Sequence, residues 1–573
     1  MTHAWLEAGC ILALALAAAA VMVPWFAALF PVASLADAPP ARGGRFLNAV
    51  ERPLLRAAGC WPPREMTASD YAVAMAVMHL IGFVVLLGIL RLQALLPWNP
   101  DGLPAVPWGI AINTAVSFVT NTNWQSYAGE TTLSPLAQVC GLTVQNFVSA
   151  AIGLCALVAL IRGFARQGCR TVGNFWQDLV RGTVGLLLPL ATLVAAVLVW
   201  QGAVQTLATS GGPAGAATTG PVASQTAIAL VGTNGGGYFN ANVAHPLANP
   251  TPLTNAVEIA ALLAIAIAGC LAFGRWVGDR RQGRALLLAN VILFLPGLAV
   301  ILSAETRPNA TLPAAVDQAA SADHDGGSLE GKEVRFGSGA SALFAAATTA
   351  TSTGSVDAMH DSLSPLGGLV TLWLMQLGEV VFGGVGTGVA GIIVYAIVAV
   401  FVAGLMVGRS PEYLGKKIEA REMKLAMVVL LVPPLVTLVG TAAACLVPAA
   451  AAAAPNPGPH GFSELLYAFT SAANNNGSAF GGLDATSLFW TLGLAAAMAV
   501  GRVLSVICLV LLGGSLAAKR PVAASLGTLP THGLLFILLV AVVVNLVGAL
   551  SFVPSLALGP IAEALQPPAG GTP

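Results

Sequence analysis

Long, uninterrupted apolar stretches are the feature that most constrains what this 573-residue chain can fold into. A helix needs about 20 apolar residues to cross the hydrocarbon core of a bilayer. Ten stretches are long enough, and they cover residues 8–32, 72–96, 139–161, 183–204, 256–274, 285–304, 366–407, 425–447, 488–513 and 533–553. Transmembrane barrels alternate apolar and polar residues, whereas these stretches are continuous. We therefore predict an all-α polytopic membrane protein with ten transmembrane helices.

The composition excludes several other classes of protein. Hydrophobic residues make up 56% of the chain and charged residues only 9%, against about 25% charged residues in an ordinary globular protein. The 25 basic residues balance the 25 acidic residues, whereas a nucleic-acid-binding protein needs a basic surplus. The eight cysteines form no CxxC pair and mostly lie in apolar runs. We expect them to be buried small hydrophobes, with no disulfide framework and no metal site.

The distribution of basic residues predicts the orientation of the chain. Of the 25 Lys and Arg residues, 20 lie in every second loop between the predicted spans. Loops rich in Lys and Arg stay in the cytoplasm, so we expect both termini to be extracytoplasmic. No Lys or Arg precedes the first apolar run, which favours an uncleaved helix over a signal peptide. The 366–407 run has twice the length of one span and is rich in glycine, which predicts a broken or re-entrant element.

Four outer loops have unusual polar cores rich in Gly, Asn, Ser and Thr. They are residues 120–125, 232–237, 351–355 and 474–478. Each follows a stretch that is long enough for a half-helix, such as 340–348 or 462–471, and each precedes another apolar run. Aligned on Asn123, Gly235, Gly354 and Gly477, the loops are 112, 119 and 123 positions apart. One such loop is best explained as an ordinary turn, but four in phase with the spans indicate an internal repeat.

We expect the repeat to organise the whole chain around a common axis. The predicted division is an N-terminal extra helix with a basic cytoplasmic loop (1–66), repeat 1 (67–170), repeat 2 (171–284), repeat 3 with a broken long helix (285–424), repeat 4 (425–520) and a C-terminal extra helix (521–573). Irregular backbone at membrane depth is tolerated only where it is buried in protein or lines a watery cavity. Four such loops around one axis would present rings of carbonyl oxygens, which can replace the hydration shell of a cation. The negative C-terminal ends of the half-helices would also favour a cation.

These loops and their surroundings resemble the KdpA family, the potassium-binding subunits of the Kdp potassium-transporting P-type ATPases, within the Trk/Ktr/HKT superfamily. The resemblance covers nearly the whole chain. The stretches that carry it are TNTNWQSYAGE (120–130), GTNGGGYFNANVAHP (232–246), TSTGSVDAMHDS (351–362), GEVVFGGVG (378–386), GRSPEYLGKKI (408–418) and AANNNGSAFGGL (472–483).

The resemblance implies a potassium filter made from four short segments. The family's filter positions correspond here to Asn121, Thr122, Asn123, Thr233, Asn234, Gly235, Ser352, Thr353, Gly354, Asn475, Asn476 and Gly477, with Gln125 and Gly232 at its border. Asn123 stands where the other three segments have glycine, so strict fourfold symmetry is not expected. K⁺ would be the transported ion, and no other cofactor is expected.

The resemblance also implies partners and a location. The chain would be one subunit of a complex in the bacterial inner membrane, with an ATP-hydrolysing P-type ATPase subunit, a single-span periplasm-facing subunit and a small helical subunit. It would select K⁺ outside the cell and pass it through an intramembrane tunnel to the ATPase subunit. No nucleic-acid partner is expected.

Two ionisable residues inside apolar runs are candidates for gating or coupling. Such groups are costly at membrane depth and often functional. Glu379 lies in the 378–386 stretch, where the resemblance suggests a loop that obstructs flow below the filter; alternatively, it reaches water at a helix end. Arg502 lies within the ninth run and would block the cytoplasmic side; alternatively, it caps carbonyl groups or pairs with an acid.

Other motifs carry less weight. Residues 386–391 match GxGxxG, but no strand precedes them, so we reject dinucleotide binding. Asp357, His360 and Asp361 resemble a metal or acid–base cluster, and we expect them instead to support the filter or line its mouth. The chain has neither a GxxxxGK[ST] loop nor a DKTG stretch, so ATP hydrolysis would belong to a partner.

The alternative function is a stand-alone K⁺ channel or an ion-coupled K⁺ symporter of the same superfamily. A third reading, a structural membrane scaffold, would leave the four polar loops unexplained.

Overall fold

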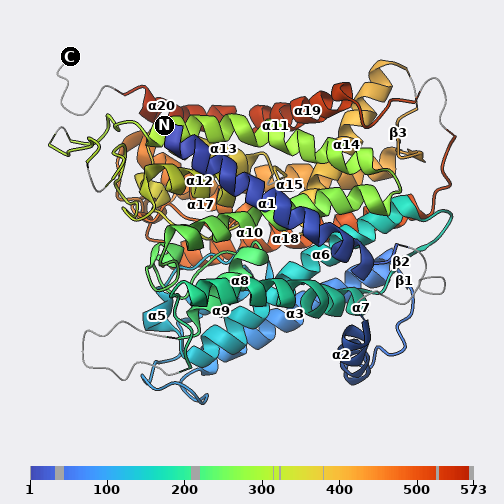
Figure 1. Cartoon of the computed structure of the whole chain (residues 1–573), viewed down its shortest axis with the longest axis horizontal. Coiled ribbons are helices and arrows are strands. Elements are labelled where there is room, and N and C mark those ends of the chain that lie inside the picture. Colours follow the sequence, from blue (N-terminus) through green and yellow to red (C-terminus); the bar gives the residue numbers. More distant parts are fainter. Residues whose placement is uncertain are drawn as a thin grey trace.

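The long helices of the chain run side by side, roughly along the long axis of the molecule (Figure 1). The computed structural model describes residues 2–32, 44–207, 220–313, 315–321, 324–378, 380–408, 410–523 and 528–566. Ten helical segments of these residues are long and apolar enough to cross a membrane. The prediction of ten spans is therefore confirmed.

The ten spans match the apolar runs to within a few residues at most ends. They are α1 (Thr2–Leu29), α3 (Ala68–Leu92), α6 (Val144–Ala165), α7 to α8 (Phe175–Val180 and Leu188–Trp200), α10 (Pro252–Trp276), α11 (Arg280–Glu305), α14 (Thr387–Met406), α15 (Ala420–Leu446), α18 (Leu488–Ala517) and α19 (Leu534–Leu558). The third and fourth spans contain π-helical turns, η1 (Ala137–Thr143) and η2 (Arg181–Leu187). Most of α6 and α10 is buried, whereas α1, α3 and α15 are largely exposed along their length. We infer that the latter face lipid.

The overlong seventh run is broken, as predicted. Its first half forms α13 (Pro365–Gln376) and its second half forms α14. Between them, Gly378, Gly383 and Gly386 adopt positive φ values of 85°, 65° and 80°. Glycine reaches this region without the steric cost that a Cβ imposes, and these residues interrupt the helix.

Four shorter apolar helices complete the repeat. They are α4 (Trp108–Val119), α9 (Val222–Val231), α12 (Gly337–Ala350) and α17 (Gly458–Ala473). At 1.5 Å per residue, helices of this length fall short of the hydrocarbon thickness of about 30 Å. Each lies between two spans in the chain and ends at one of the four polar loops. Span, half-helix, loop and span thus recur four times, with α1 and α19 outside the repeats.

Short elements connect the spans. They are α2 (Gly44–Ala57), α5 (Gly129–Thr132), α16 (Pro448–Ala451), α20 (Pro560–Ala564), and the single turns η3 (Asn242–Ala244) and η4 (His360–Ser362). Strand β1 (Met66–Thr67) pairs with β2 (Thr171–Gly173), and β3 (Glu412–Tyr413) pairs with β4 (Lys416–Lys417), both antiparallel.

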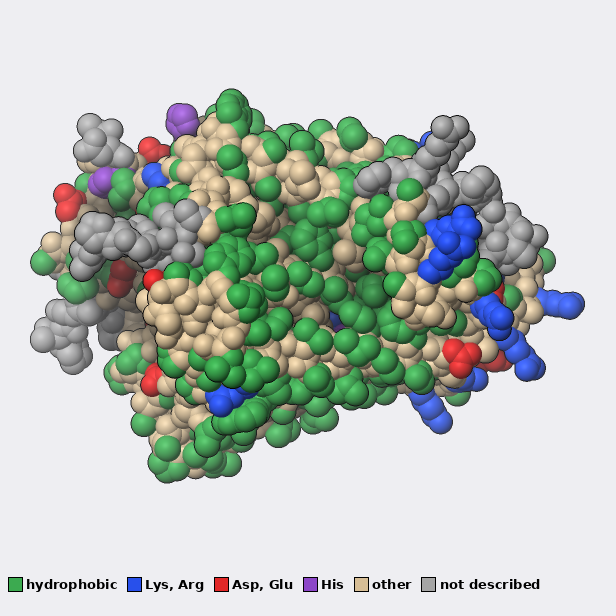
Figure 2. All heavy atoms as spheres, turned by 90° about the horizontal axis from the view of Figure 1, so that it is seen from below, with side chains coloured by type: hydrophobic (Ala, Val, Ile, Leu, Met, Phe, Trp, Pro, Cys, Tyr) green, Lys and Arg blue, Asp and Glu red, His purple; other side chains and the backbone are tan. Residues whose placement is uncertain are grey.

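Lys and Arg side chains gather near one end of the bundle. Figure 2 shows hydrophobic side chains over the middle of one face and most of the visible Lys and Arg side chains towards the right-hand end. Buried ion pairs are found in this region, including Arg162 with Asp178 (Nη2–Oδ1 2.9 Å) and Arg181 with Glu51 (3.0 Å). The basic residues of α6 and η2 are thereby fixed to the neighbouring elements.

Candidate functional site

The four polar loops meet with their backbones in close contact. A Cβ atom added to Gly235 would lie 2.2 Å from the amide nitrogen of Gly354, and one added to Gly354 would lie 2.8 Å from the carbonyl carbon of Gly477. A Cβ atom added to Gly477 would lie 1.7 Å from the carbonyl oxygen of Thr122. Contacts this short leave no room for a side chain, so these three positions require glycine. The sequence alignment that placed them in register therefore corresponds to spatial proximity.

Hydrogen bonds join neighbouring loops all the way round. Asn123 donates from Nδ2 to the carbonyl oxygen of Gly235, linking the first loop to the second (2.9 Å). The remaining links are Gly354 N to the Asn234 carbonyl (3.3 Å), Ser352 Oγ to the Asn475 carbonyl (3.1 Å) and Asn475 Nδ2 to Thr122 Oγ1 (2.9 Å). The loops thus form a closed ring in chain order.

The backbone conformation of the loops repeats as well. The second residue of each loop has a positive φ: 66° at Asn121, 44° at Thr233, 55° at Ser352 and 59° at Asn475. None of these residues is glycine, and such a conformation costs about 1–3 kcal/mol in a non-glycine residue. A strained conformation that recurs at the same position of four loops indicates a function that depends on backbone geometry.

The loop amides are bonded back onto their own half-helices. Asn123 N donates to Ser117 O (3.2 Å), and Gly235 N donates to Ala229 O (3.1 Å). One position earlier, the same bond recurs in all four loops: Thr122 N to Ser117 O (2.9 Å), Asn234 N to Ala229 O (2.8 Å), Thr353 N to Thr348 O (3.0 Å) and Asn476 N to Ser471 O (2.8 Å). Several carbonyl oxygens, by contrast, accept no hydrogen bond from any residue that the structure describes: those of Thr122, Asn123, Gly354, Asn476 and Gly477. The ring therefore offers unpaired acceptors and few unpaired donors, a combination suited to a cation.

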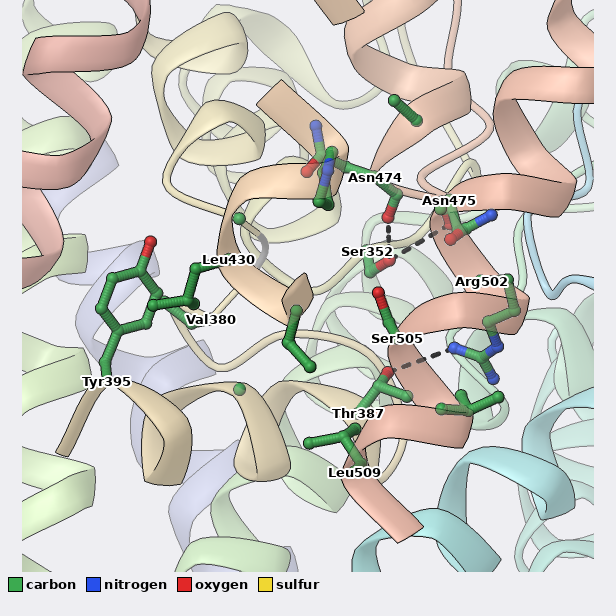
Figure 3. Close-up of a pocket in the computed structure, with 17 residues that line it drawn as sticks. Ser352, Val380, Thr387, Tyr395, Leu430, Asn474, Asn475, Arg502, Ser505 and Leu509 are labelled. Carbon is green, nitrogen blue, oxygen red and sulfur yellow. Dashed lines mark hydrogen bonds between the residues drawn. The ribbon is translucent and has the colours of Figure 1, made fainter. Parts of the chain in front are cut away.

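Cavities lie on the two sides of the ring. The larger, of about 730 Å³, is lined on the ring side by Asn123, Gly354 and Gly477. The smaller, of about 70 Å³, is lined by Ser352, Asn474 and Asn475 (Figure 3). The aligned residues of the first, third and fourth loops therefore face one cavity, and earlier residues of the third and fourth loops face the other. The ring stands between the two, where an ion passing from one to the other would have to cross it.

Arg502 of α18 lies at the smaller cavity, close to the ring. Its side chain is buried, with Nη1 3.3 Å from Thr387 Oγ1 and Nη2 3.2 Å from the carbonyl oxygen of Ser149. Figure 3 shows the Arg502 side chain directed at Thr387, in the same pocket that Ser352 and Asn475 line. A buried guanidinium places a positive charge on this side of the ring.

The structure brings the predicted filter residues together. All twelve belong to the four loops of the ring. Gln125 accepts a hydrogen bond from Gly237 N (2.9 Å) and lines the larger cavity, and the Gly232 carbonyl accepts from Asn121 Nδ2 (3.3 Å). Glu379 lies outside the described residues.

Sequence reasoning missed a second layer of polar residues behind the ring. Asn146 accepts from Asn123 Nδ2 (2.8 Å), and the Ser149 hydroxyl donates to Asn121 Oδ1 (2.9 Å). Both residues lie on α6 and are buried. In the sequence these residues form a polar patch inside the third apolar run, and an inspection of the loops alone does not detect it.

The three polar residues after the third loop do not form one cluster. Asp357 accepts from Asn255 Nδ2 (3.1 Å), and His360 Nδ1 lies 2.8 Å from the hydroxyl of Tyr467. Asp361 contacts His460 instead (3.1 Å). Asp357 therefore contacts α10, whereas His360 and Asp361 of η4 both contact α17.

Known proteins are similar to this chain over most of its length. Residues 11–565 match the KdpA family, described as the potassium-transporting ATPase A subunit. The potassium-transporting ATPase potassium-binding subunit of Sorangium cellulosum is 56% identical over 536 residues, which are 91% of this chain and 92% of that protein. Its counterpart in Laribacter hongkongensis is 53% identical over 542 residues, covering 93% of this chain and 95% of the relative.

A solved structure supports the fold. The potassium transporter TrkH from Vibrio parahaemolyticus superposes with a TM-score of 0.51 over 89% of this chain and 98% of that chain, at 16% sequence identity. At this identity the likeness concerns the fold alone. The family match extends over nearly the whole sequence. The chain belongs to the KdpA family.

Proposed function

From this family membership and the geometry of the ring, we propose that the chain is the potassium-binding and translocating subunit of an ATP-driven potassium uptake complex. It selects K⁺ at the four loops and delivers the ion to a partner P-type ATPase subunit. The observation that carries the proposal is the closed ring of four loops, in which backbone amides bond to the half-helices while several carbonyl oxygens of the first, third and fourth loops accept no hydrogen bond from the described residues.

Selection follows from the chemistry of the ring. Backbone carbonyls coordinate K⁺ in place of its water shell, and the C-terminal ends of the half-helices α4, α9, α12 and α17 add a negative potential of about half a charge each. Close backbone packing at Gly235, Gly354 and Gly477 fixes the spacing of the oxygens. Asn123 replaces the fourth glycine, and its amide bonds to Gly235 and Asn146 hold the first loop in place.

The segment between α13 and α14 supports an obstruction directly below the ring. Val385 N donates to Thr233 Oγ1 (2.8 Å), and Gly383 N donates to Ala350 O (3.0 Å). Residues 383 and 385 of this segment therefore contact the second loop and the end of α12, directly before the third loop. Together with the guanidinium of Arg502, it would oppose straight passage of a cation, so that K⁺ leaves sideways toward the ATPase subunit. We assign Glu379, which belongs to this segment, to the same gating role.

The proposal includes the setting of the complex. The chain would work in the bacterial inner membrane with both termini extracytoplasmic, because its basic residues gather in alternate loops. The larger cavity would then open outward and the smaller one would lie toward the cytoplasm. Besides the ATPase subunit, the partners would be a single-span periplasm-facing subunit and a small helical subunit. The alternative, a channel or symporter that works alone, lacks an explanation for Arg502 and the 377–386 segment.

The test is potassium-stimulated ATP hydrolysis by the purified complex. We expect Gly354→Asp to raise the K⁺ concentration for half-maximal stimulation, because the new side chain meets the backbone of the fourth loop. Gly533→Asp is the matched control: a Cβ there meets no atom within 4 Å, and Asp suits the N-cap position that Gly533 occupies before α19. Equal half-maximal concentrations in all three proteins would contradict the filter assignment. Conduction of K⁺ by the chain alone without ATP would favour the channel.

A further inference from the structure

Four acidic and histidine side chains from three separate parts of the chain converge away from the ring. Asp361 belongs to η4, His460 and Glu464 to α17, and Glu563 to α20. His460 and Glu464 are four residues apart, so they lie on one face of α17. Figure 1 shows α17 and α20 at the end of the bundle where α1 begins.

The distances within this group are short. His460 Nε2 lies 3.1 Å from Asp361 Oδ1, and His460 Nδ1 lies 2.8 Å from Glu563 Oε1. One nitrogen or oxygen atom from each of Asp361, His460 and Glu464 lies within 4.8 Å of the other two. The group is thus compact enough for its members to share one ion.

Glu464 supplies an independent observation. Its side chain is fully buried, and Oε1 accepts a hydrogen bond from Asn456 Nδ2 (2.7 Å). Oε2 is buried as well and has no hydrogen-bond partner among the described residues. A buried carboxylate oxygen without a partner is costly, and a bound cation would remove that cost.

The excess of carboxyl groups also favours a bound cation. Three carboxyl groups surround one imidazole, and the ion pairs that they form within the described chain all involve His460. Partial burial disfavours the charged imidazole, but the hydrogen bonds to Asp361 and Glu563 outweigh it and raise the pKa of His460 to about 10. A proton and a metal ion would therefore compete for Nε2.

We propose that Asp361, His460 and Glu464 bind one divalent transition-metal ion of the zinc type, with Glu563 orienting the imidazole. Ligand atoms about 2.0–2.2 Å from a tetrahedral Zn²⁺ are about 3.3 Å apart, close to the Asp361–His460 separation. Glu563 on the other ring nitrogen completes the carboxylate–histidine–metal arrangement common in zinc sites. A mixed nitrogen and oxygen set selects such a metal over Ca²⁺ or Mg²⁺, which prefer oxygen ligands alone.

The metal would join three segments that lie far apart in the sequence. It would fix the half-helix α17 to the turn that follows the third loop and to the C-terminal helix α20. We expect bound Zn²⁺ to raise the thermal unfolding midpoint, because a ligand that binds only the folded state stabilises it. This inference goes beyond potassium binding and stands without it.

The experiment is Zn²⁺ titration of the purified full-length chain in detergent, with cysteines blocked because free thiols such as Cys10, Cys140 and Cys445 are exposed. We expect one saturable equivalent in the unchanged chain. His460→Gln and Asp361→Asn should abolish it, and Glu563→Gln should weaken it by about 10–100-fold, as is usual for a residue that orients a metal ligand. His532→Gln, which changes a histidine just before α19, should bind like the unchanged chain.

Two further measurements keep the test decisive if a variant unfolds. Glu464→Gln removes charge with little change of shape, and it should weaken binding while the far-ultraviolet circular dichroism stays that of the unchanged chain. Co²⁺ in place of Zn²⁺ should give a visible absorption spectrum that disappears in His460→Gln. The proposal is overturned if no saturable equivalent binds, or if His460→Gln and Glu464→Gln both bind as the unchanged chain does; His460 is then a protonated bridge between carboxylates.

Discussion

At the scale of single residues, the ring depends on backbone positions that ordinary side chains fit poorly. Asn121, Thr233, Ser352 and Asn475 hold the same left-handed conformation at the same place in four loops. Gly235, Gly354 and Gly477 occupy the points where the neighbouring loops touch. The strain is distributed over all four loops, and hydrogen bonds between them hold each in place. Substitutions here should therefore change ion affinity more than folding.

Gly477→Ala tests that expectation at the tightest contact. The added methyl group would lie 1.7 Å from Thr122 O, and φ at this position is 101°. Strain of about 1–3 kcal/mol corresponds to about 5- to 150-fold in affinity, so we expect the half-saturating K⁺ concentration for ATPase stimulation to rise by a factor in this range. Gly533→Ala, in open space, is the control. An unchanged K⁺ dependence in Gly477→Ala would show that the contact lies off the ion path.

Arg502 is predicted to act through its charge. Arg502→Ala should increase passive K⁺ leak through the complex in proteoliposomes without ATP, because the positive charge beside the smaller cavity is lost. Arg502→Lys keeps the charge while losing the two-sided contact with Thr387 and Ser149, and it should leak much less. Equal leak in the two variants would assign Arg502 a packing role.

At the scale of elements, the sequence was sufficient for the spans and the half-helices. Continuous apolar runs predict helices in a membrane because the backbone has no other way to satisfy its hydrogen bonds there. The break at Gly378, Gly383 and Gly386 was also predictable, since length and glycine content both argued against one helix. The π-helical turns of the third and fourth spans were not, because a shift in hydrogen-bond register leaves the apolar pattern almost unchanged.

The second layer behind the ring shows why part of the site could not be predicted from the sequence. Asn146 and Ser149 belong to a short polar patch in an otherwise apolar helix, and only packing shows which loop they face. The group around His460 could not be predicted from the sequence for a similar reason. Its members come from positions 361, 460, 464 and 563, and only the fold brings them together.

The buried ion pair between Arg162 on α6 and Asp178 on α7 should contribute strongly to the stability of the contact between these two helices. Asp178→Asn leaves the guanidinium buried without its counter-charge, which typically costs about 3–5 kcal/mol. We expect a clearly lower thermal unfolding midpoint in detergent. The double variant Arg162→Met with Asp178→Leu should recover part of the loss, since no charge is then left buried. The account would be contradicted if the loss of stability in the double variant equalled the sum of the losses in Arg162→Met and Asp178→Leu.

At the scale of the whole molecule, four repeats place four loops at one level between two cavities. We propose that the larger cavity gives an ion access to the ring, and that the segment between α13 and α14, together with Arg502, restricts its exit on the other side. Such a chain suits a subunit that supplies K⁺ to an energy-converting partner.

The most direct test of the central claim is to locate the ion in the complex. Rb⁺ substitutes for K⁺ and scatters anomalously, so crystals of the complex grown in Rb⁺ would show where it binds. We predict an anomalous peak inside the ring, coordinated by carbonyl oxygens that include those of Thr122, Gly354 and Gly477. The same crystals carrying Gly477→Ala should show a weaker peak. An ordered Rb⁺ peak elsewhere in the chain, with none within the ring, would contradict the account.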